Sequence, residues 1–311
     1  MPDIINRTDA EALIPVQVSG EIIKAVTQQS AVLSLMRKLP NMTSKQQKMP
    51  VLSALATAGF VNGDTGLKAT SKAAWMNKFI TAEEIAVIIP IPEAVLDDAE
   101  YDIFGEIKPQ IVEEFGRVID GAALFDVDRP TSWPTAIVNS AIAAGKTVTL
   151  GTGADIAADV NELMGLVEAS GYDVNGFAAA ISVKSKLRGL RDNTGSPIFQ
   201  PSLTTGTPST LYGQAINYPK NGAWDATKAL ILGGDFNQAV YAIRQDITYK
   251  VLDQAVISDG DGKIIYNLAQ QDMVALRCVM RLGWQLPNPI NRMDESANRY
   301  TFAVLTPGGG V

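Results

Sequence analysis

The stretch LRGLRDNTGSPIF, residues 187–199, runs from two arginines through a turn to an apolar pair. It follows the strand-like segment AAAIS (178–182) and the short basic helical pattern VKSKLRGLR (183–191). Gly195 and Pro197 favour a turn, because glycine and proline adopt backbone conformations that interrupt helices and strands. The stretch therefore indicates a strand, a helix and a loop in succession, which is typical of a mixed helix and sheet region.

Composition limits the classes of protein to consider. The chain has 311 residues, of which 46% are hydrophobic and 19% charged, so it can bury a sizeable core. Lys and Arg number 26 against 33 Asp and Glu, a net charge of -7. This excess of acidic residues argues against a protein that binds nucleic acid through its phosphate backbone, since such binding needs clustered positive charge.

The sequence also indicates the compartment in which the protein is made. The single cysteine, Cys278, excludes an internal disulfide and fits a reducing compartment. No apolar run approaches the roughly 20 residues that span a bilayer. The first residues, MPDIINRTDAEALIP, carry early acids and lack the apolar region of a signal peptide. We expect a protein without membrane contact that is made in a cytoplasm.

The chain contains no histidine, which removes Ser-His-Asp and Cys-His nucleophile systems and most zinc sites. SAIAAGKT (140–147) ends like a phosphate-binding loop, but Ser140 stands where the pattern needs glycine, and a strand-like run follows. SDGDGKIIYN (258–267) is close to a calcium loop, but Lys263 occupies a ligand position and Gln270 replaces the closing glutamate. We expect a surface turn and a solvated loop tip there, with no catalytic residue, cofactor or metal.

Two N-terminal segments are too short and have too few apolar residues to fold alone. Residues 13–39 begin extended and become helical, as an arm that packs on something else. Residues 41–82 place two strand-capable flanks around the polar, Gly-rich middle VNGDTGLKATS (61–71). A lone two-stranded ribbon is marginal in water, so its stability should come from a neighbour.

The clearest helix is predicted over 101–125, where Ile107, Ile111 and Phe115 mark one apolar face. Pro109 should kink it or mark a second start. Residues 135–245 alternate helix and strand.

Farther along, strands at 247–252 and 263–268 are expected to flank a loop, and 272–289 should form a long strand with a bulge near Gly283. A final strand within 291–311 has no evident place. The predicted class is α+β with protruding arms.

The order of these segments resembles the major capsid proteins of tailed bacteriophages with the Hong Kong 97-like fold. In that family a helix bearing an LR-LKD-GxPIF run follows a strand, and L-G-PV and GDF segments come next. The matching residues here are Leu187, Arg188, Leu190, Arg191, Asp192, Gly195, Pro197, Ile198 and Phe199, followed by Leu211, Gly213, Gly234, Asp235 and Phe236. The resemblance covers nearly the whole chain.

The resemblance implies a division of the chain into an arm, an extended loop, two domains and a C-terminal segment. These are the N-arm at 1–40, the extended loop at 41–82, a peripheral domain at 83–134 and 246–290 with the spine helix 101–125, an axial domain at 135–245, and the C-terminal segment 291–311. The implied function is self-assembly as pentamers and hexamers into an icosahedral capsid that encloses the double-stranded DNA of a tailed phage.

The resemblance also implies partners and a location. Family members whose scaffold is fused to the capsid protein carry a long helical extension before the arm. In this sequence the LIP segment of the arm already begins at residue 13, so we expect a separate scaffolding protein. A portal protein, a cement protein and packaged DNA without specific contacts complete the expected partners. The protein should reside in the virion after assembly in the host cytoplasm.

Seven residues are candidates for contacts between subunits: Lys68, Asp64, Trp75, Arg188, Arg191, Asp192 and Phe199. The arginines have two interpretations, a solvated helix face or salt bridges to acids of the adjacent subunit.

Some family members join an extended-loop lysine to an asparagine of a neighbour with the help of a glutamate. Lys68 matches the lysine, but Gln271 and Asp272 stand near the asparagine position, and Cys278 and Val279 near that of the glutamate. We expect a shell held without covalent links.

Two alternatives stay open at this point. An encapsulin-like nanocompartment would have the same fold but would enclose an enzyme instead of DNA. A histidine-free enzyme using carboxylates and lysine would be a monomer that turns over small molecules. Particle morphology and contents separate the three hypotheses.

Overall fold

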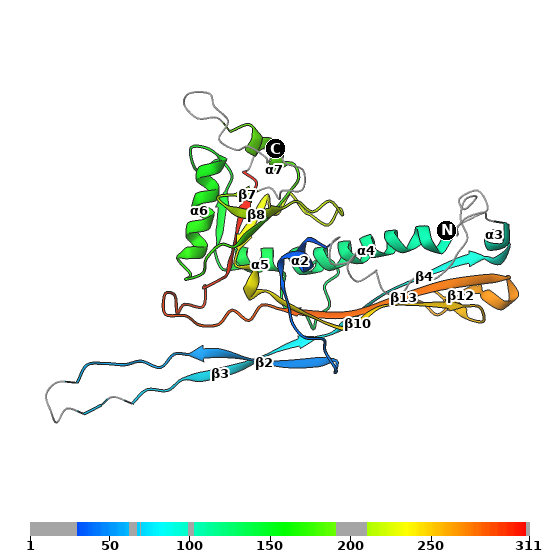
Figure 1. The fold of residues 1–311 in the computed structure, drawn as a ribbon, viewed down its shortest axis with the longest axis horizontal. Helices are drawn as coiled ribbons and strands as arrows, with labels where there is room; N and C mark the ends of the chain where they lie inside the picture. Colours follow the sequence, from blue (N-terminus) through cyan, green and yellow to red (C-terminus); the bar gives the residue numbers. More distant parts are fainter. Residues whose placement is uncertain (1–29, 62–66, 69, 99–102, 191–209, 309–311) are drawn as a thin grey trace.

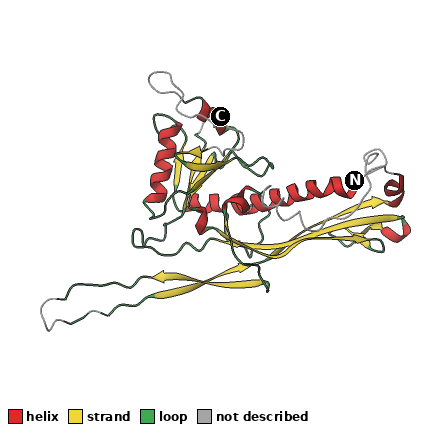
Figure 2. Cartoon of the chain, viewed as in Figure 1, coloured by secondary structure: helices red, strands yellow, loops and turns green. Residues whose placement is uncertain are grey.

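The computed structural model describes residues 30–61, 67–68, 70–98, 103–190 and 210–308. It combines two β-sheets, a projecting two-stranded ribbon and a short hairpin with several helices (Figures 1 and 2). The helical elements are α2 (Ala31–Leu35), α3 (Glu93–Asp98), α4 (Ile103–Phe125), α5 (Ile137–Ala143), α6 (Ile156–Glu168), α7 (Val183–Arg188) and the 3-10 turns η1 (Phe236–Gln238) and η2 (Leu268–Gln270). The mixed helix and sheet class predicted from the sequence is confirmed.

The first sheet is long and has four strands in the order β1-β10-β13-β4. Its strands are β1 (Arg37–Lys38), β10 (Val240–Leu252), β13 (Met273–Gln285) and β4 (Glu83–Pro92). β13 is antiparallel to β10 on one side and to β4 on the other, so it forms the centre of the sheet, and β1 joins β10 in parallel.

Helix α4 lies along this long sheet (Figure 1). Ile107, Ile111 and Phe115 recur at helical spacing and are all buried in the same core cluster as Leu276 of β13. The predicted apolar face of the helix is therefore the face that meets the sheet. Pro109 is the seventh residue of the helix, past its first turn, and α4 continues through it although proline has no backbone N–H to donate.

The second sheet has six strands in the order β5-β14-β9-β6-β8-β7. They are β5 (Thr147–Thr149), β14 (Phe302–Thr306), β9 (Ile231–Gly234), β6 (Gly176–Ala179), β8 (Gln214–Asn217) and β7 (Thr210–Leu211). Helices α6 and α7 share a separate core cluster with this sheet. β14 pairs with β5 and β9, so the final strand that the sequence left unplaced lies inside the sheet.

Strands occupy both positions predicted around the loop after residue 252. The first is the end of β10, which runs without a break from residue 240 to 252 and pairs with β13. The second is β12 (Ile264–Asn267). The loop between them contains the further strand β11 (Val256–Ser258), which pairs with β12 in a hairpin, since nearby strands pair at low entropic cost.

The expected bulge at Gly283 is wrong. The register shifts between β10 and β13 lie at positions 243–248 of β10, whereas Gly283 pairs regularly with Ala242. A Cβ atom at Gly283 would stand 2.4 Å from the carbonyl oxygen of Thr81. Glycine is required here for the close approach of another backbone segment rather than for a bulge.

The ribbon consists of β2 (Gln46–Ala54) and β3 (Ala74–Thr81), paired antiparallel from Gln46↔Thr81 to Ala54↔Ala74. It projects from the body beside the long sheet, and its far end reaches beyond both sheets (Figure 1). The sequence prediction of a two-stranded excursion is confirmed.

Candidate assembly surface

The root of the ribbon is fixed to the body by several contacts. Lys78 Nζ donates to the carbonyl oxygen of Leu286 at 3.0 Å, and Gln285 Nε2 donates to that of Phe79 at 2.9 Å. Ile80 is fully buried against Val240 and other apolar side chains. Burial, with a smaller contribution from nearby Arg299, lowers the pKa of the Lys78 ammonium. The root is therefore part of the folded subunit.

One face of the ribbon, from Phe79 near the root to the far end, has a different environment. Side chains alternate between the two faces of a strand, so Trp75 and Phe79 share the face opposite to Lys78 and Ile80. Trp75 is 67% exposed and Phe79 44% exposed, and Phe60 nearer the tip is fully exposed. Large apolar side chains grouped in the open mark an interaction surface. We call this apolar surface the ribbon face. It comprises Leu52, Trp75 and Phe79 on the paired strands, and Phe60 and Leu67 nearer the far end.

The structure separates the predicted contact residues. Lys68 and Trp75 both belong to the ribbon region and are exposed, whereas Arg188 is exposed at the end of α7 beside the six-stranded sheet. The ribbon and α7 lie on opposite sides of the body in Figure 1. The remaining candidates lie outside the described residues: Asp64, Arg191, Asp192 and Phe199. The three candidates that the structure describes, Lys68, Trp75 and Arg188, are therefore not gathered into a single site of one chain.

The structure also describes the residues at the positions considered for covalent cross-linking. Asp272 stands in a turn with φ 48°, and its carbonyl oxygen accepts from the backbone N–H of Glu93 at 2.8 Å. Cys278 and Val279 are buried in β13, and burial raises the pKa of the Cys278 thiol to about 11. A thiol in that state is neutral near pH 7 and is a poor base for proton removal from a lysine.

Asp120 is a buried carboxylate that the sequence analysis did not single out. Its oxygens accept from Ser30 Oγ at 2.6 Å, from the backbone N–H groups of Ala31 and Val32 at 3.0 and 3.1 Å, and from Asn221 Nδ2 at 2.7 Å. Burial raises the pKa of Asp120, and the hydrogen bonds oppose that shift. The residue joins α2, α4 and the loop after β8. Only its place within the apolar run RVIDGAALF hints at this role.

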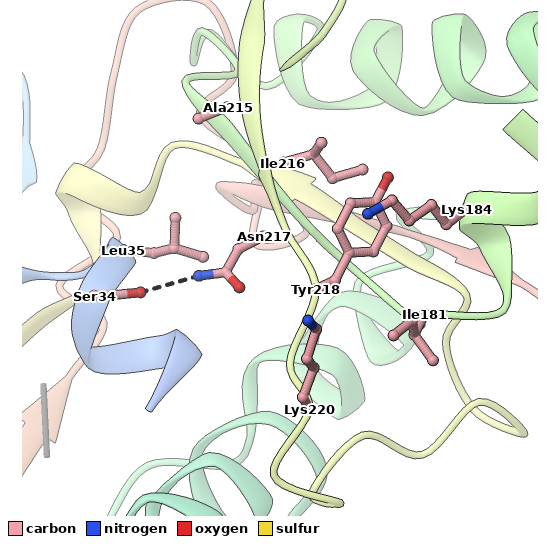
Figure 3. A pocket seen from close by; sticks show the side chains of 9 residues that line it. All are labelled: Ser34, Leu35, Ile181, Lys184, Ala215, Ile216, Asn217, Tyr218 and Lys220. Atoms are coloured by element: carbon pink, nitrogen blue, oxygen red, sulfur yellow. Dashed lines mark hydrogen bonds between the residues drawn. The ribbon is translucent and has the colours of Figure 1, made fainter. Parts of the chain in front are cut away.

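A groove lies between α2 and the six-stranded sheet (Figure 3). It has a volume of about 430 Å³, and α2, β8 and α7 all contribute to its walls. Asn217 Nδ2 donates to Ser34 Oγ at 3.1 Å across one end, and Lys184 Nζ lies 5.3 Å from the ring centroid of Tyr218. The lining is apolar with lysines at its edge.

The two near-motifs form a turn between α5 and β5 and the tip of the β11–β12 hairpin. Residues 140–147 span the end of α5, a turn with Gly145 at φ 71°, and the start of β5. The carboxylate of Asp259 accepts from the backbone N–H groups of Asp261 and Lys263 at the tip of the β11–β12 hairpin. Within the described ranges, no group of three or more acidic or cysteine side chains could hold a metal. No helix of the described chain is long and apolar enough to cross a bilayer.

Comparison with known proteins identifies the family. The model of the phage capsid family matches residues 10–290. The major capsid protein of Staphylococcus phage 80alpha is 28% identical over 242 residues, which are 76% of this chain and 68% of that protein.

Solved structures agree. A chain from Microbacterium phage Oxtober96 is 38% identical, with a TM-score of 0.80 and coverage of 98% of this chain and 100% of that one. A chain from Mycobacterium phage Cain is 31% identical, with a TM-score of 0.80 and coverage of 99% and 100%. The family match spans the ribbon, the long sheet and most of the six-stranded sheet. The chain belongs to the phage capsid family and is a structural protein of a phage shell.

Proposed function

We propose that this capsid protein assembles as pentamers and hexamers with the Hong Kong 97-like layout. In that layout the ribbon is the extended loop, α4 and the long sheet form the peripheral domain, and the six-stranded sheet forms the axial domain. The face of the six-stranded sheet under α6 and α7 has a core cluster of its own, which supports this division, whereas its other face shares the cluster of α4 and the long sheet through Leu232 and Phe302. β14 then belongs to the axial domain, and residues 240–245 belong to the peripheral sheet.

The ribbon face is the observation that carries the proposal. Trp75 and Phe79 are exposed on a ribbon whose root is firmly held, so their surroundings must come from outside the chain. A face of this kind on each copy, meeting a different surface of the next copy, gives head-to-tail contacts that close into rings. The ribbon of one subunit therefore lies over a neighbouring subunit.

The remaining partners follow from the same role. A separate scaffolding protein, a portal and a cement protein would act during and after assembly in the host cytoplasm. The net charge of -7 suits a wall that borders packaged DNA without binding it specifically. Lys68 makes at most ion pairs, and the exposed Arg188, together with Arg191 outside the described residues, meets acids of the adjacent axial domain.

The alternative hypotheses are less well supported. Membership of the phage capsid family disfavours an encapsulin-like compartment and argues against an enzyme.

Negative-stain microscopy of the expressed full chain tests the proposal. Icosahedral shells or rings with five- and six-fold symmetry support it, whereas a monodisperse monomer contradicts it. The contents of the particles distinguish the compartments: co-purified DNA with portal and tail proteins indicates a phage capsid, and a single enzyme cargo indicates a nanocompartment.

A further inference from the structure

The groove beside α2 combines an exposed apolar side chain with two cations. Ile181, Lys184 and Lys220 all line it (Figure 3), and Ile181 is 54% exposed. Neither lysine forms an ion pair with an acid of the described residues, although Glu113 lines an adjoining cavity together with Lys220. An exposed isoleucine beside such cations suits a partner surface that offers carboxylates.

The two sides of the six-stranded sheet carry opposite charges. Helix α6 lies over β5, β14 and β9, whereas the groove runs along β8 on the side of α2 (Figure 1). Residues 147–175, which include α6, contain five acidic residues and no lysine or arginine, and only Asp159 of the five is buried. Residues 181–190 and 210–224, which supply most of the groove lining, contain three lysines, one arginine and no acidic residue.

The outer face of α6 has a glycine between two carboxylates. Gly165 is exposed in the interior of the helix, and a Cβ atom at this position would have nothing within 4 Å. Glycine destabilises a helix interior relative to alanine, and no contact with the described chain requires it here.

Glu162 and Glu168 lie three residues before and after Gly165, so they share its exposed face and stand about 9 Å apart along the helix axis. Neither glutamate forms an ion pair with a cation of the described residues. The absent side chain between two long ones leaves a notch that a side chain of another chain can enter.

The groove and the notch match in shape and in charge. The notch at Gly165 leaves room for an apolar side chain such as the exposed Ile181, and the groove brings cations to the carboxylates that flank the notch. Because the two surfaces differ and lie on opposite sides of one chain, contact between them is head-to-tail and can close into a ring.

We propose that Ile181 of one subunit packs on Gly165 of the next copy, with Lys184 and Lys220 beside Glu162 and Glu168 of that copy. The contact joins the six-stranded sheets of neighbouring subunits around a pentamer or hexamer and does not involve the ribbon. It rests on the proposed function, because it requires rings of subunits.

Disulfide formation in assembled particles tests the contact. The native cysteine, Cys278, is buried and should not react. In particles of the full chain, Gly165→Cys combined with Ile181→Cys should give a ladder up to pentamers and hexamers on a non-reducing gel after oxidation with copper phenanthroline. Each copy then links to a different neighbour on each side. Each single variant is a matched control and should stay monomeric.

The other outcomes separate this contact from the proposed function. Dimers as the final product, or cross-linking of a single variant, would show that like surfaces meet and would overturn the head-to-tail contact. Monomers alone, in shells that microscopy shows to be intact, would overturn the contact and leave the proposed assembly in place. Wild-type protein that forms no ring or shell would overturn both.

Charge reversal tests the pairing by a different readout. Lys184→Glu with Lys220→Glu should raise the protein concentration needed for assembly by about tenfold, since two partly exposed ion pairs become repulsive. Glu162→Lys with Glu168→Lys should have the same effect, and all four substitutions together should restore assembly. Urea unfolding of unassembled subunits should be unchanged in both double variants. Assembly that is unaffected by either double variant, or that the fourfold variant does not restore, would contradict the pairing.

Discussion

Strands β3 and β4 are separated only by Ala82, yet they are stabilised in different ways. β4 has β13 beside it and shares the core cluster of α4 through the buried Ile91. Among the described strands β3 pairs with β2 alone, and Trp75 and Phe79 remain open to solvent. The two strands therefore draw on different sources of free energy. β4 is stabilised by its own chain, and under the proposed function the exposed face of β3 is covered by another copy.

The free energy of burying apolar side chains explains how the body and the ribbon can be stabilised in different ways. Burying one large apolar side chain contributes about 1.5–3 kcal/mol. An isolated subunit cannot gain this from the ribbon face, so the ribbon adds little to folding. In a shell every copy can gain it, and the sum over several side chains can exceed the entropy lost on association. The comparison predicts that changes in the body damage folding, and changes in the ribbon damage assembly.

The largest effect is expected from removing the end of the ribbon. Deleting residues 59–70 takes away Phe60 and Leu67 while leaving the paired strands and the root contacts. Closed shells should be lost, leaving soluble subunits or small rings, because the neighbour no longer receives the apolar tip. Sedimentation and electron microscopy measure this. Intact shells of unchanged stability would contradict the role of the ribbon.

A substitution in the body should give the opposite pattern. Phe115 is 2% exposed at the interface of α4 with the long sheet, so Phe115→Ala should lower the free energy of unfolding by about 3–5 kcal/mol. The matched variant Trp75→Ala on the ribbon should change it by less than about 0.5 kcal/mol, as surface substitutions do. Urea unfolding of unassembled subunits measures both. A loss below about 1 kcal/mol for Phe115→Ala would mean that the helix does not pack as described.

Asp120 should give an intermediate effect. Asp120→Asn replaces one of the acceptor oxygens with a donor that faces Ser30, Asn221 and two backbone N–H groups. We expect the free energy of unfolding to fall by about 1–3 kcal/mol, the cost of leaving a buried polar group unsatisfied. Glu114→Gln, at an exposed position on the same helix, is the matched control and should change it little.

The effect of Asp120 should also depend on pH. Because burial raises the pKa of this carboxyl, the folded state holds the proton more tightly than the unfolded state. The stabilising contribution is therefore complete below the unfolded pKa of about 3.9 and is lost as the pH rises through the folded pKa. The difference in unfolding free energy between the wild type and Asp120→Asn should shrink as the pH rises above about 4. A difference that grows over this range would be inconsistent with a raised pKa.

The smallest effect is expected at Lys68. It is exposed, and the positions that should supply its partner and base contain Asp272 and the buried Cys278. Boiled mature particles should run on a denaturing gel as a monomer band near 33.2 kDa. Lys68→Ala should leave that band unchanged. A ladder of covalent pentamers and hexamers in the wild type would refute the non-covalent shell.

The sequence predicted features that depend on neighbouring residues. Helix α4 was predictable because Ile107, Ile111 and Phe115 repeat at the period of a helix. The ribbon was visible because a polar, Gly-rich stretch interrupts two strand-forming flanks. Periodicity and turn chemistry carry this information directly.

Features set by distant partners could not be predicted in the same way. β14 lies between β5 and β9, which are about 155 and 70 residues earlier in the chain, so no local pattern could place it. Gly283 was misread as a bulge because the reason for its glycine is the backbone of Thr81. Asp120 was missed because its partners Ser30 and Asn221 lie 90 and 101 residues away.

Hydroxyl-radical footprinting of the ribbon tests the central claim most directly. Oxidation of Phe60, Trp75 and Phe79 is measured by mass spectrometry in soluble subunits and in assembled shells, with the exposed Met293 as an internal reference for dose. The account predicts fast oxidation of the three residues in subunits and strong protection in shells, because a neighbouring copy covers the ribbon face. Equal oxidation in subunits and shells would show that the ribbon stays in solvent, and would contradict the account.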